Sequence, residues 1–448
     1  MDVSAKLNNS NVNSMGNKIK FLFFSVFGLL LFFMPITIGE VKTIPLDHIL
    51  TAINTYTPWF GPNFAMGIAL VGGILPWADK SFKKSVMDFL LAVFRLAGIP
   101  ICLMAYLNVG PAWLMAPNML PFVWVKIVIA VTMIVPIGSL FLTLIICFGA
   151  LEFIGVMVRP IMKPVFGTPG KSAIDAVASF VGSFSVAIFL TNRLYNESKY
   201  TAREAIIIMS GFSTVSATFM IIVAKTSGFM GIWNFYFWST LIICFVVTAI
   251  TVRIYPIKAI PMAYKDGVGK PEIKAEDKTL LVQAWDEGLE ASARSGNVFK
   301  AMVENVWSGM KMCFVLTPSI ASIGILAFVL VNMTPVFSVI GLIFYPFTFL
   351  LSLIGLEEPM LVAKAASVIL GEMFVPNIIV KGASDVARYI IAVSSVSAII
   401  FFGGSIPCML ATEIGKDIVP FWKLVLIWFE RTALSILIAG VVGLIYFA

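Results

Sequence analysis

The polar side chains that could do chemistry are few, and the most informative of them lie inside apolar segments. Glu372 and Asn377 occupy one such segment, on either side of Pro376. A carboxyl group deep in an apolar segment is costly and is usually functional, and a nearby amide can both donate and accept hydrogen bonds. Two interpretations of Glu372 remain open: a contact with a solute or a coupling proton, or a structural carboxyl that is protonated or bonded to a serine.

Two clusters of hydroxyl side chains provide the other candidate ligands. Ser213-Thr214-Val215-Ser216-Ala217 in the first half of the chain is echoed by Ser394-Ser395-Val396-Ser397-Ala398 in the second. Small hydroxyl residues also let membrane helices pack closely, so each serine alone has a structural explanation. Their placement at corresponding points of two repeats favours a polar site at the midplane of a membrane. The side chains expected to bind a solute are Ser183, Ser185, Ser213, Thr214, Ser216, Glu372, Asn377, Ser394, Ser395 and Ser397.

Other kinds of chemistry lack the residues that they need. The chain has one histidine, His48, and its five cysteines lie in apolar stretches without paired spacing, so we expect no metal site, no disulfide framework and no cofactor. Gly170-Lys171-Ser172 resembles the end of a phosphate-binding loop, but Val165 stands where the first glycine is needed. No paired aspartates and no nucleophile arrangement are visible in the sequence, which predicts that the protein is not an enzyme.

The composition indicates which elements must carry these side chains. Of 448 residues, 59% are hydrophobic and 12% are charged, and the mean hydropathy is +0.98. Most of the chain therefore needs a bilayer as its solvent. The net charge of +7 comes from basic residues in short segments between apolar runs, which indicates membrane topology rather than nucleic-acid binding. We predict an all-α polytopic membrane protein with spans near 21–38, 63–77, 87–107, 122–148, 205–223, 232–254, 306–331, 389–410 and 424–447.

The distribution of basic residues also predicts the orientation. Lys6, Lys18 and Lys20 precede the first span, which places the N-terminus in the cytoplasm. The C-terminus is then expected on the periplasmic or extracellular side of a bacterial inner membrane. The expected parts are a cytoplasmic N-terminal tail (1–20), three N-terminal spans (21–107), a first repeat (121–255), a cytoplasmic polar linker (256–305) and a second repeat (306–447).

Three short matches, in the same order in both halves, predict inverted structural repeats. Besides the hydroxyl clusters, residues 154–160 match residues 340–346, and residues 180–186 match residues 369–375. Each repeat is expected to hold a re-entrant hairpin followed by a broken transmembrane helix, because non-helical backbone at membrane depth survives only when it is buried or lines a wet cavity.

The two hairpins have expected bounds, tips and starting points. The inner hairpin is placed at 171–193 with its tip at Gly182, and the outer hairpin at 357–381 with its tip at Gly371. Thr168-Pro169 and Glu358-Pro359 each resemble a helix cap followed by proline at the first helical position.

The segments 182–185 and 210–219 resemble the nucleoside-recognition or Gate domain of bacterial YjiH-type membrane proteins, and the resemblance covers nearly the whole chain, including residues 371–377. More distantly, the layout is similar to that of concentrative nucleoside transporters, whose inner hairpin bears Gly-Gln-Thr-Glu and whose outer hairpin bears Asn-Glu-Phe. Here Ser183, Phe184 and Ser185 replace the Gln, Thr and Glu of the first element, and only Glu372 remains of the second. The resemblance implies that family's fold, coupling to sodium ions or protons, and a homo-oligomer, specifically a trimer.

Together these observations predict a secondary active transporter that holds a small polar solute between the hairpin tips and the broken spans. An amino acid, a dipeptide, a polyamine and a nucleoside-like compound all fit, and Glu372 among hydroxyls slightly favours a solute that carries an ammonium group. No ATP-binding motif is visible, so a gradient must supply the energy. The alternative is a Gate-domain membrane protein with a structural or signalling role and no transport.

Overall fold

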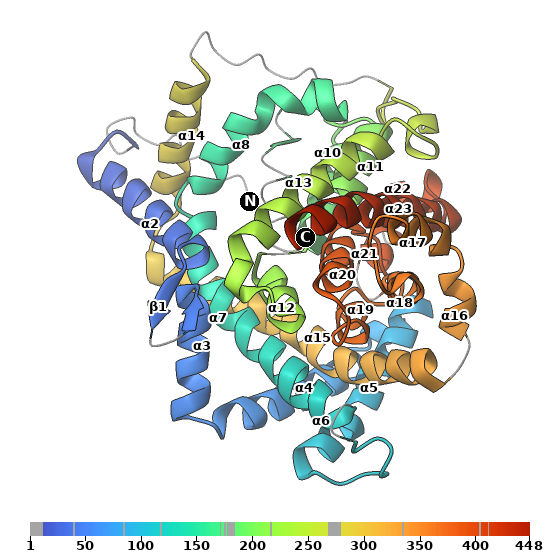
Figure 1. The fold of residues 1–448 in the computed structure, drawn as a ribbon. Helices are drawn as coiled ribbons and strands as arrows, with labels where there is room; N and C mark the ends of the chain where they lie inside the picture. The colour runs from blue at the N-terminus through green and yellow to red at the C-terminus, as the bar shows by residue number, and fades with distance from the viewer. Residues whose placement is uncertain are drawn as a thin grey trace.

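The computed structural model describes residues 12–38, 41–83, 86–116, 119–170, 172–173, 176, 184–215, 217–267, 279–333, 336–402, 405–410 and 412–448. The described chain is almost entirely helical (Figure 1). Its buried apolar side chains form two large cores. The expected all-α membrane class is confirmed.

The N-terminal part contains one feature that the sequence analysis missed. A two-stranded antiparallel hairpin, in which Ile36 pairs with Thr43, separates the first two long helices. The first helix ends at Phe33, earlier than predicted, because Pro35 cannot continue it. The elements are α2 (Met15–Phe33), β1 (Ile36–Ile38), β2 (Val41–Thr43), α3 (Pro45–Tyr56), α4 (Phe60–Ala78), η1 (Ser81–Lys83) and α5 (Val86–Leu107).

The first predicted repeat contains two long helices, α7 (Ile129–Ile146) and α13 (Trp233–Thr251), an amphipathic connecting helix, α8 (Ala150–Ile161), and two short helices, α11 (Ala202–Gly211) and α12 (Ala217–Ser227), separated by an unwound segment. The other elements are α6 (Leu120–Phe122), the π-helical turn η2 (Val123–Val128), η3 (Met162–Phe166), α10 (Phe184–Asn196), η4 (Met230–Ile232) and η5 (Ile257–Ala259).

The second predicted repeat follows the linker helix, α14 (Leu280–Arg294), and begins with the longest helix of the described chain. The elements are α15 (Val298–Met333), α16 (Val336–Gly341), α17 (Tyr345–Ser352), α18 (Pro359–Val368), α19 (Val375–Ile379), α20 (Asp385–Ser397), α21 (Ser405–Leu410), α22 (Glu413–Asp417) and α23 (Phe421–Tyr446).

Six segments among the described residues are long and apolar enough to cross a bilayer. They confirm a multi-pass membrane protein. The candidate spans are Phe60–Ala78, Asp88–Leu107, Val123–Ile145, Met230–Thr251, Val298–Leu326 and Phe421–Tyr446. The predicted spans near 205–223 and 389–410 are each divided into two shorter helices, α11 with α12 and α20 with α21.

Two groups of helices pack closely. In one group α15 packs against α4, α5 and α7, and in the other α20 packs against α13 and α23 (Figure 1). The buried side chains of α20 are shared between the two cores. Glycines allow the closest approaches in the first group: a Cβ built on Gly72 would lie 2.0 Å from the carbonyl oxygen of Phe314, and one on Gly98 would lie 2.1 Å from that of Pro318. Small residues that let helix backbones meet are the usual device of membrane helix packing.

The linker helix α14 docks against α8 and α2 rather than extending into solvent. Arg159 on α8 forms a two-pronged ion pair with Glu287, with nitrogen–oxygen distances of 2.7 and 2.6 Å. Lys20 on α2 donates a hydrogen bond to the carbonyl of Ser292 at 3.2 Å. Lys20, which is expected on the cytoplasmic side, and Arg159 are therefore both bonded to the linker helix, which supports one common side for α2, α8 and α14.

This arrangement gives a labelling prediction. Thr279 lies at the exposed start of the linker helix. Ala112 is exposed in the uncharged loop after α5, which is expected on the opposite side because basic residues concentrate in cytoplasmic loops. We expect Thr279→Cys to resist a membrane-impermeant thiol reagent in intact cells and to react after lysis, whereas Ala112→Cys reacts in both. Background is low because three of the five native cysteines are buried and two are partly buried. Reaction of Thr279→Cys in intact cells would reverse the topology.

Candidate functional site at the interrupted helices

Two helices stop inside the protein, and they stop in the same way. After α11, the Phe212 amide donates to the carbonyl of Ile208 at 3.1 Å. The Thr214 amide then donates to the carbonyl of Phe212 at 2.7 Å. After α20, the Ala398 amide donates to the backbone carbonyl of Ser394 at 2.9 Å. The Ile400 amide then donates to the carbonyl of Ala398 at 2.7 Å. A last helical bond followed by a very tight turn therefore occurs in both halves, which supports a structural repeat.

Local hydroxyl groups explain why the backbone can leave the helix without water. The Ser213 hydroxyl donates to the carbonyl of Ile208 at 3.3 Å. In the second interruption, Ser405 accepts from the Phe401 amide at 3.0 Å and donates to the Ile399 carbonyl at 2.7 Å. Side chains of this type offer the backbone an alternative to helical bonding. The polar backbone groups of each interruption are thus partly satisfied by neighbouring serines.

The structure corrects the register of the third sequence match. Ser213 and Thr214 lie in the unwound segment after α11, whereas Ser394 to Ser397 form the last turn of α20. By hydrogen bonding, Phe212 corresponds to Ala398. The hydroxyl clusters are therefore not at equivalent points of the two halves, and that part of the prediction is wrong. Similar short sequences arise easily from a limited membrane alphabet, whereas the backbone turn is set by the whole packing environment.

The two interruptions touch each other. The Thr214 hydroxyl, which is 1% exposed, donates to the carbonyl of Val396 at 3.2 Å, so the unwound segment after α11 contacts the last turn of α20. This bond joins residues from the two predicted repeats at a point enclosed by protein. A polar contact between two unwound or terminal helix segments is the arrangement found at solute sites of transporters built from broken helices.

The outer hairpin places Glu372 at its turn, between α18 and α19. One carboxylate oxygen of Glu372 accepts from the backbone amides of Phe374 and Val375 at 2.7 and 2.9 Å. The side chain is 6% exposed. The carboxylate therefore holds the hairpin tip in shape, and its assignment as a direct solute contact stays a prediction.

Asn377 joins the outer hairpin to both interrupted helices. Its side-chain nitrogen donates to the Ser395 hydroxyl on α20 at 3.2 Å, and its oxygen accepts from the Ser227 hydroxyl at the end of α12 at 3.4 Å. The same nitrogen also lies 3.3 Å from the carbonyl oxygens of Met373 and Phe374. Asn377 is fully buried. One amide thus connects three elements that the sequence analysis assigned to one site.

The other residues predicted to bind a solute differ in their surroundings. The buried Ser394 hydroxyl has no hydrogen-bond partner among the described residues, and the Ser397 hydroxyl accepts from Ser435 at 2.8 Å. Ser185 lies in α10, whose backbone is described at this position, but the Ser185 side chain lies outside the described part of the structure. The tip of the predicted inner hairpin, Gly182 with Ser183, and Ser216 also lie outside the described residues.

Glu358 has a different role from the expected one. The residue stands before α18, but its side chain makes no capping bond there. Its carboxylate instead accepts from the amide and hydroxyl of Ser384 at 3.1 and 2.7 Å. Ser384 is itself the cap of α20. Glu358 therefore ties the start of the outer hairpin to the start of the interrupted helix that follows it.

Arg431 was not among the residues expected to bind a solute. Its proximity to Lys423 in the sequence favours an interfacial position, but its side chain is fully buried where α23 packs against α13 and α20. The available signal was a basic residue well inside the apolar run that forms α23. Its contacts with the interrupted helices are described below.

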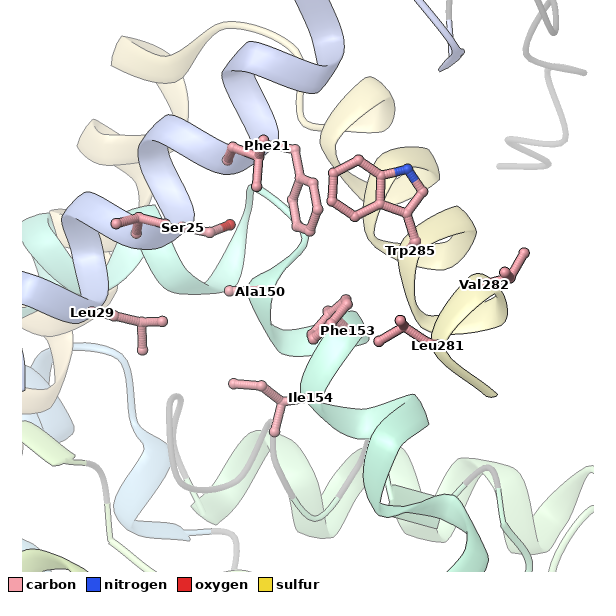
Figure 2. A pocket seen from close by; sticks show the side chains of 11 residues that line it. Phe21, Ser25, Leu29, Ala150, Phe153, Ile154, Leu281, Val282 and Trp285 are labelled. Atoms are coloured by element: carbon pink, nitrogen blue, oxygen red, sulfur yellow. The ribbon is translucent and has the colours of Figure 1, made fainter. Parts of the chain in front are cut away.

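An apolar groove on the protein is a poor place for a polar solute. It runs between α2, α8 and α14, and Figure 2 shows its wall of apolar side chains, including Phe21, Phe153 and Trp285. The one hydroxyl on the wall, Ser25, donates to the carbonyl of Phe148 at 3.4 Å. Sites for small molecules need a few convergent polar groups to fix orientation. The interrupted helices and the outer hairpin provide such groups, and this groove does not.

Comparison with known proteins supports the resemblance seen in the sequence. Residues 128–230, which run from the last residue of η2 through α12 to the first residue of η4, match the Gate family, described as nucleoside recognition. An uncharacterized protein of Alkalihalophilus pseudofirmus is 27% identical over 447 residues, which cover 96% of this chain and 95% of that protein.

Solved structures with a similar arrangement include two CNTnw variants. One, in an outward-facing state, has a TM-score of 0.47 and 14% identity, and the alignment covers 97% of this chain and 93% of that one. Another, in an intermediate state, has a TM-score of 0.46 and 15% identity, with 95% and 99% covered.

Proposed function

We propose that the protein is a secondary active transporter that carries a small polar solute across a bacterial inner membrane. The solute would bind where the outer hairpin meets the two interrupted helices. The observation that carries this proposal is the set of buried hydrogen bonds linking Thr214 to Val396 and Asn377 to Ser395 and Ser227. Helices that break at membrane depth, with polar groups converging on the break, are characteristic of transporter sites.

The chemistry of these groups favours an uncharged solute with several donors and acceptors. Asn377, Ser395 and Thr214 are neutral and can each both donate and accept. The Glu372 carboxylate is engaged by two backbone amides, so the geometry gives less support to an ammonium-bearing solute than the sequence did. Together with the Gate match, this makes a nucleoside-like compound our leading candidate.

The proposed site is closed in this structure. Thr214, Asn377 and Ser395 are at most 1% exposed and their polar groups bond to other parts of the protein. A solute must therefore exchange with bonds such as that between Asn377 and Ser395. Separation of the outer hairpin from α12 and α20 would release the groups needed to bind it. A gradient of the solute or of a coupling ion would drive the cycle, with sodium and protons both open as coupling ions.

A thermal-unfolding screen of the purified protein identifies the solute. Amino acids, dipeptides, polyamines and nucleosides would be added singly, with and without sodium, because a ligand that binds only the folded state raises its apparent stability. We expect a nucleoside-like compound to give the largest shift. A clear shift with polyamines alone would restore the ammonium-bearing class, and no shift from any class would count against a solute site.

Asn377→Ala tests the location of the site. The change removes the amide that would bond to the solute once its bonds to Ser395 and Ser227 are exchanged, so we expect solute affinity to fall by about 1–2 kcal/mol, or roughly 5- to 30-fold. Asn305→Ala is the control, because Asn305 is a partly buried amide in a span outside the proposed site, and its side-chain nitrogen donates to the Ala301 carbonyl at 3.2 Å and lies 3.6 Å from the Cys147 sulfur. Equal effects of the two changes on affinity, measured by titration, would show that the site lies elsewhere.

A further inference from the structure

Arg431 lies in α23 with its guanidinium fully enclosed by protein. Two of its nitrogens donate to the carbonyl oxygen of Ser397, at 2.9 and 2.7 Å. A third interaction is with the Thr248 hydroxyl at 3.0 Å, and a fourth is with the Cys244 sulfur at 3.6 Å. Each of these partners is electrically neutral. A buried charge without a carboxylate needs another source of negative potential.

The ends of the interrupted helices supply that potential. Ser397 is the last residue of α20, and the amide that would bond its carbonyl in a continued helix, that of Phe401, donates to Ser405 instead. Gly211 is the last residue of α11, and its carbonyl oxygen lies 2.9 Å from the Thr248 hydroxyl that Arg431 contacts. Arg431 thus reaches one helix end directly and the other through a single hydroxyl.

The positive charge of Arg431 is balanced by the partial negative charges at the ends of α11 and α20. The carboxyl end of a helix carries an effective charge of about −0.5, and α11 and α20 bring two such ends to one place. Together they offset roughly one positive charge, which is what a guanidinium supplies. The enclosed arginine therefore has a counter-charge in the backbone, and the unbonded helical carbonyls have a donor.

Carbonyls at the ends of broken helices commonly coordinate a mobile cation in transporters. We propose that Arg431 is a tethered cation that occupies such a carbonyl site and holds the ends of α11 and α20 in fixed relation. The proposal concerns the interrupted helices themselves and does not depend on the identity of a solute. Without the arginine side chain, the vacated space and carbonyls would form a binding site for free guanidinium. Any coupling ion would then bind elsewhere in the protein.

The first test compares Arg431→Ala with Arg431→Met by thermal unfolding in detergent. Each variant is measured once in guanidinium chloride at low millimolar concentration and once in sodium chloride of equal ionic strength. Alanine leaves space and exposed carbonyls, so guanidinium should raise the Tm of Arg431→Ala by a few degrees through binding. Methionine fills the space without charge, so Arg431→Met and the unaltered protein should show no such rise. An Arg431→Ala protein that does not respond to guanidinium overturns the proposal.

A second comparison decides the matter if Arg431→Ala does not fold. Arg431→Lys keeps the charge and Arg431→Met keeps only the bulk. A tethered cation predicts that Arg431→Lys unfolds at a higher temperature than Arg431→Met. A purely packing role predicts the reverse order, because replacing a buried charged group by an apolar one of similar volume is often stabilising. The reverse order would therefore overturn the proposal.

Discussion

Glu372→Gln should weaken solute binding by about 2–3 kcal/mol, which is roughly 30- to 150-fold in affinity. The carboxylate of Glu372 accepts from the amides of Phe374 and Val375 at 2.7 and 2.9 Å and so fixes the turn of the outer hairpin. Charge-assisted bonds of this kind are about twice as strong as neutral ones. Glutamine keeps the volume and one acceptor but loses the charge, so the turn that presents Asn377 becomes less ordered.

The control for this change is Glu430→Gln, because Glu430 is another carboxyl within the apolar sequence of a span. One oxygen of Glu430 is buried without a hydrogen-bond partner among the described residues. We expect its replacement to leave solute affinity unchanged. Titration of the solute against both variants gives the comparison. If Glu372→Gln folds normally and binds with the affinity of the unaltered protein, neither a solute contact nor a positioning role for Glu372 survives.

The largest effect on folding should come from Gly72→Val, which we expect to destabilise the protein by about 3 kcal/mol or more. A Cβ at this position would lie 2.0 Å from the carbonyl oxygen of Phe314 and 2.7 Å from its carbonyl carbon, both backbone atoms of α15. Backbone cannot rotate away as a side chain can. Helices α4 and α15 would have to separate, and the packing between them would be lost.

Gly67 provides the matched control on the same helix. A Cβ added there meets nothing within 4 Å, so Gly67→Ala should leave stability unchanged or raise it by about 0.5–1 kcal/mol through lower backbone entropy in the unfolded chain. Thermal unfolding in one detergent compares the two variants. A normal Tm for Gly72→Val would mean that α4 and α15 do not meet closely in the membrane.

The positions of the long helices could be predicted from the sequence because span length and apolar composition are local properties. The segment Phe421–Tyr446 illustrates this, since the predicted span 424–447 falls almost entirely within it. The β-hairpin at Ile36–Thr43 could not be predicted in the same way. Its position depends on a residue far away in the sequence. Asp47 accepts a hydrogen bond from the Thr43 hydroxyl of the hairpin at 3.2 Å, and it also accepts from Lys225 of α12 at 2.5 Å.

The candidate site could be predicted in its residue types but not in its bonding. Asn377 and Glu372 were singled out because polar groups in apolar segments are costly. Their partners depend on how α12, the outer hairpin and α20 pack, and sequence spacing contains no information about that. Arg431 was misplaced for the same reason, since its counter-charge is the backbone of two helix ends, which no side-chain pattern reveals.

Flux of the solute into proteoliposomes tests the central claim most directly. The compound identified by thermal unfolding would be supplied outside vesicles that contain the purified protein, and its uptake would be followed over time with and without unlabelled solute inside. The transporter account predicts saturable uptake that internal solute accelerates by exchange, with a lower apparent affinity in the Asn377→Ala protein. Binding of the compound without any flux above that of protein-free vesicles would contradict transport and favour a structural or signalling role.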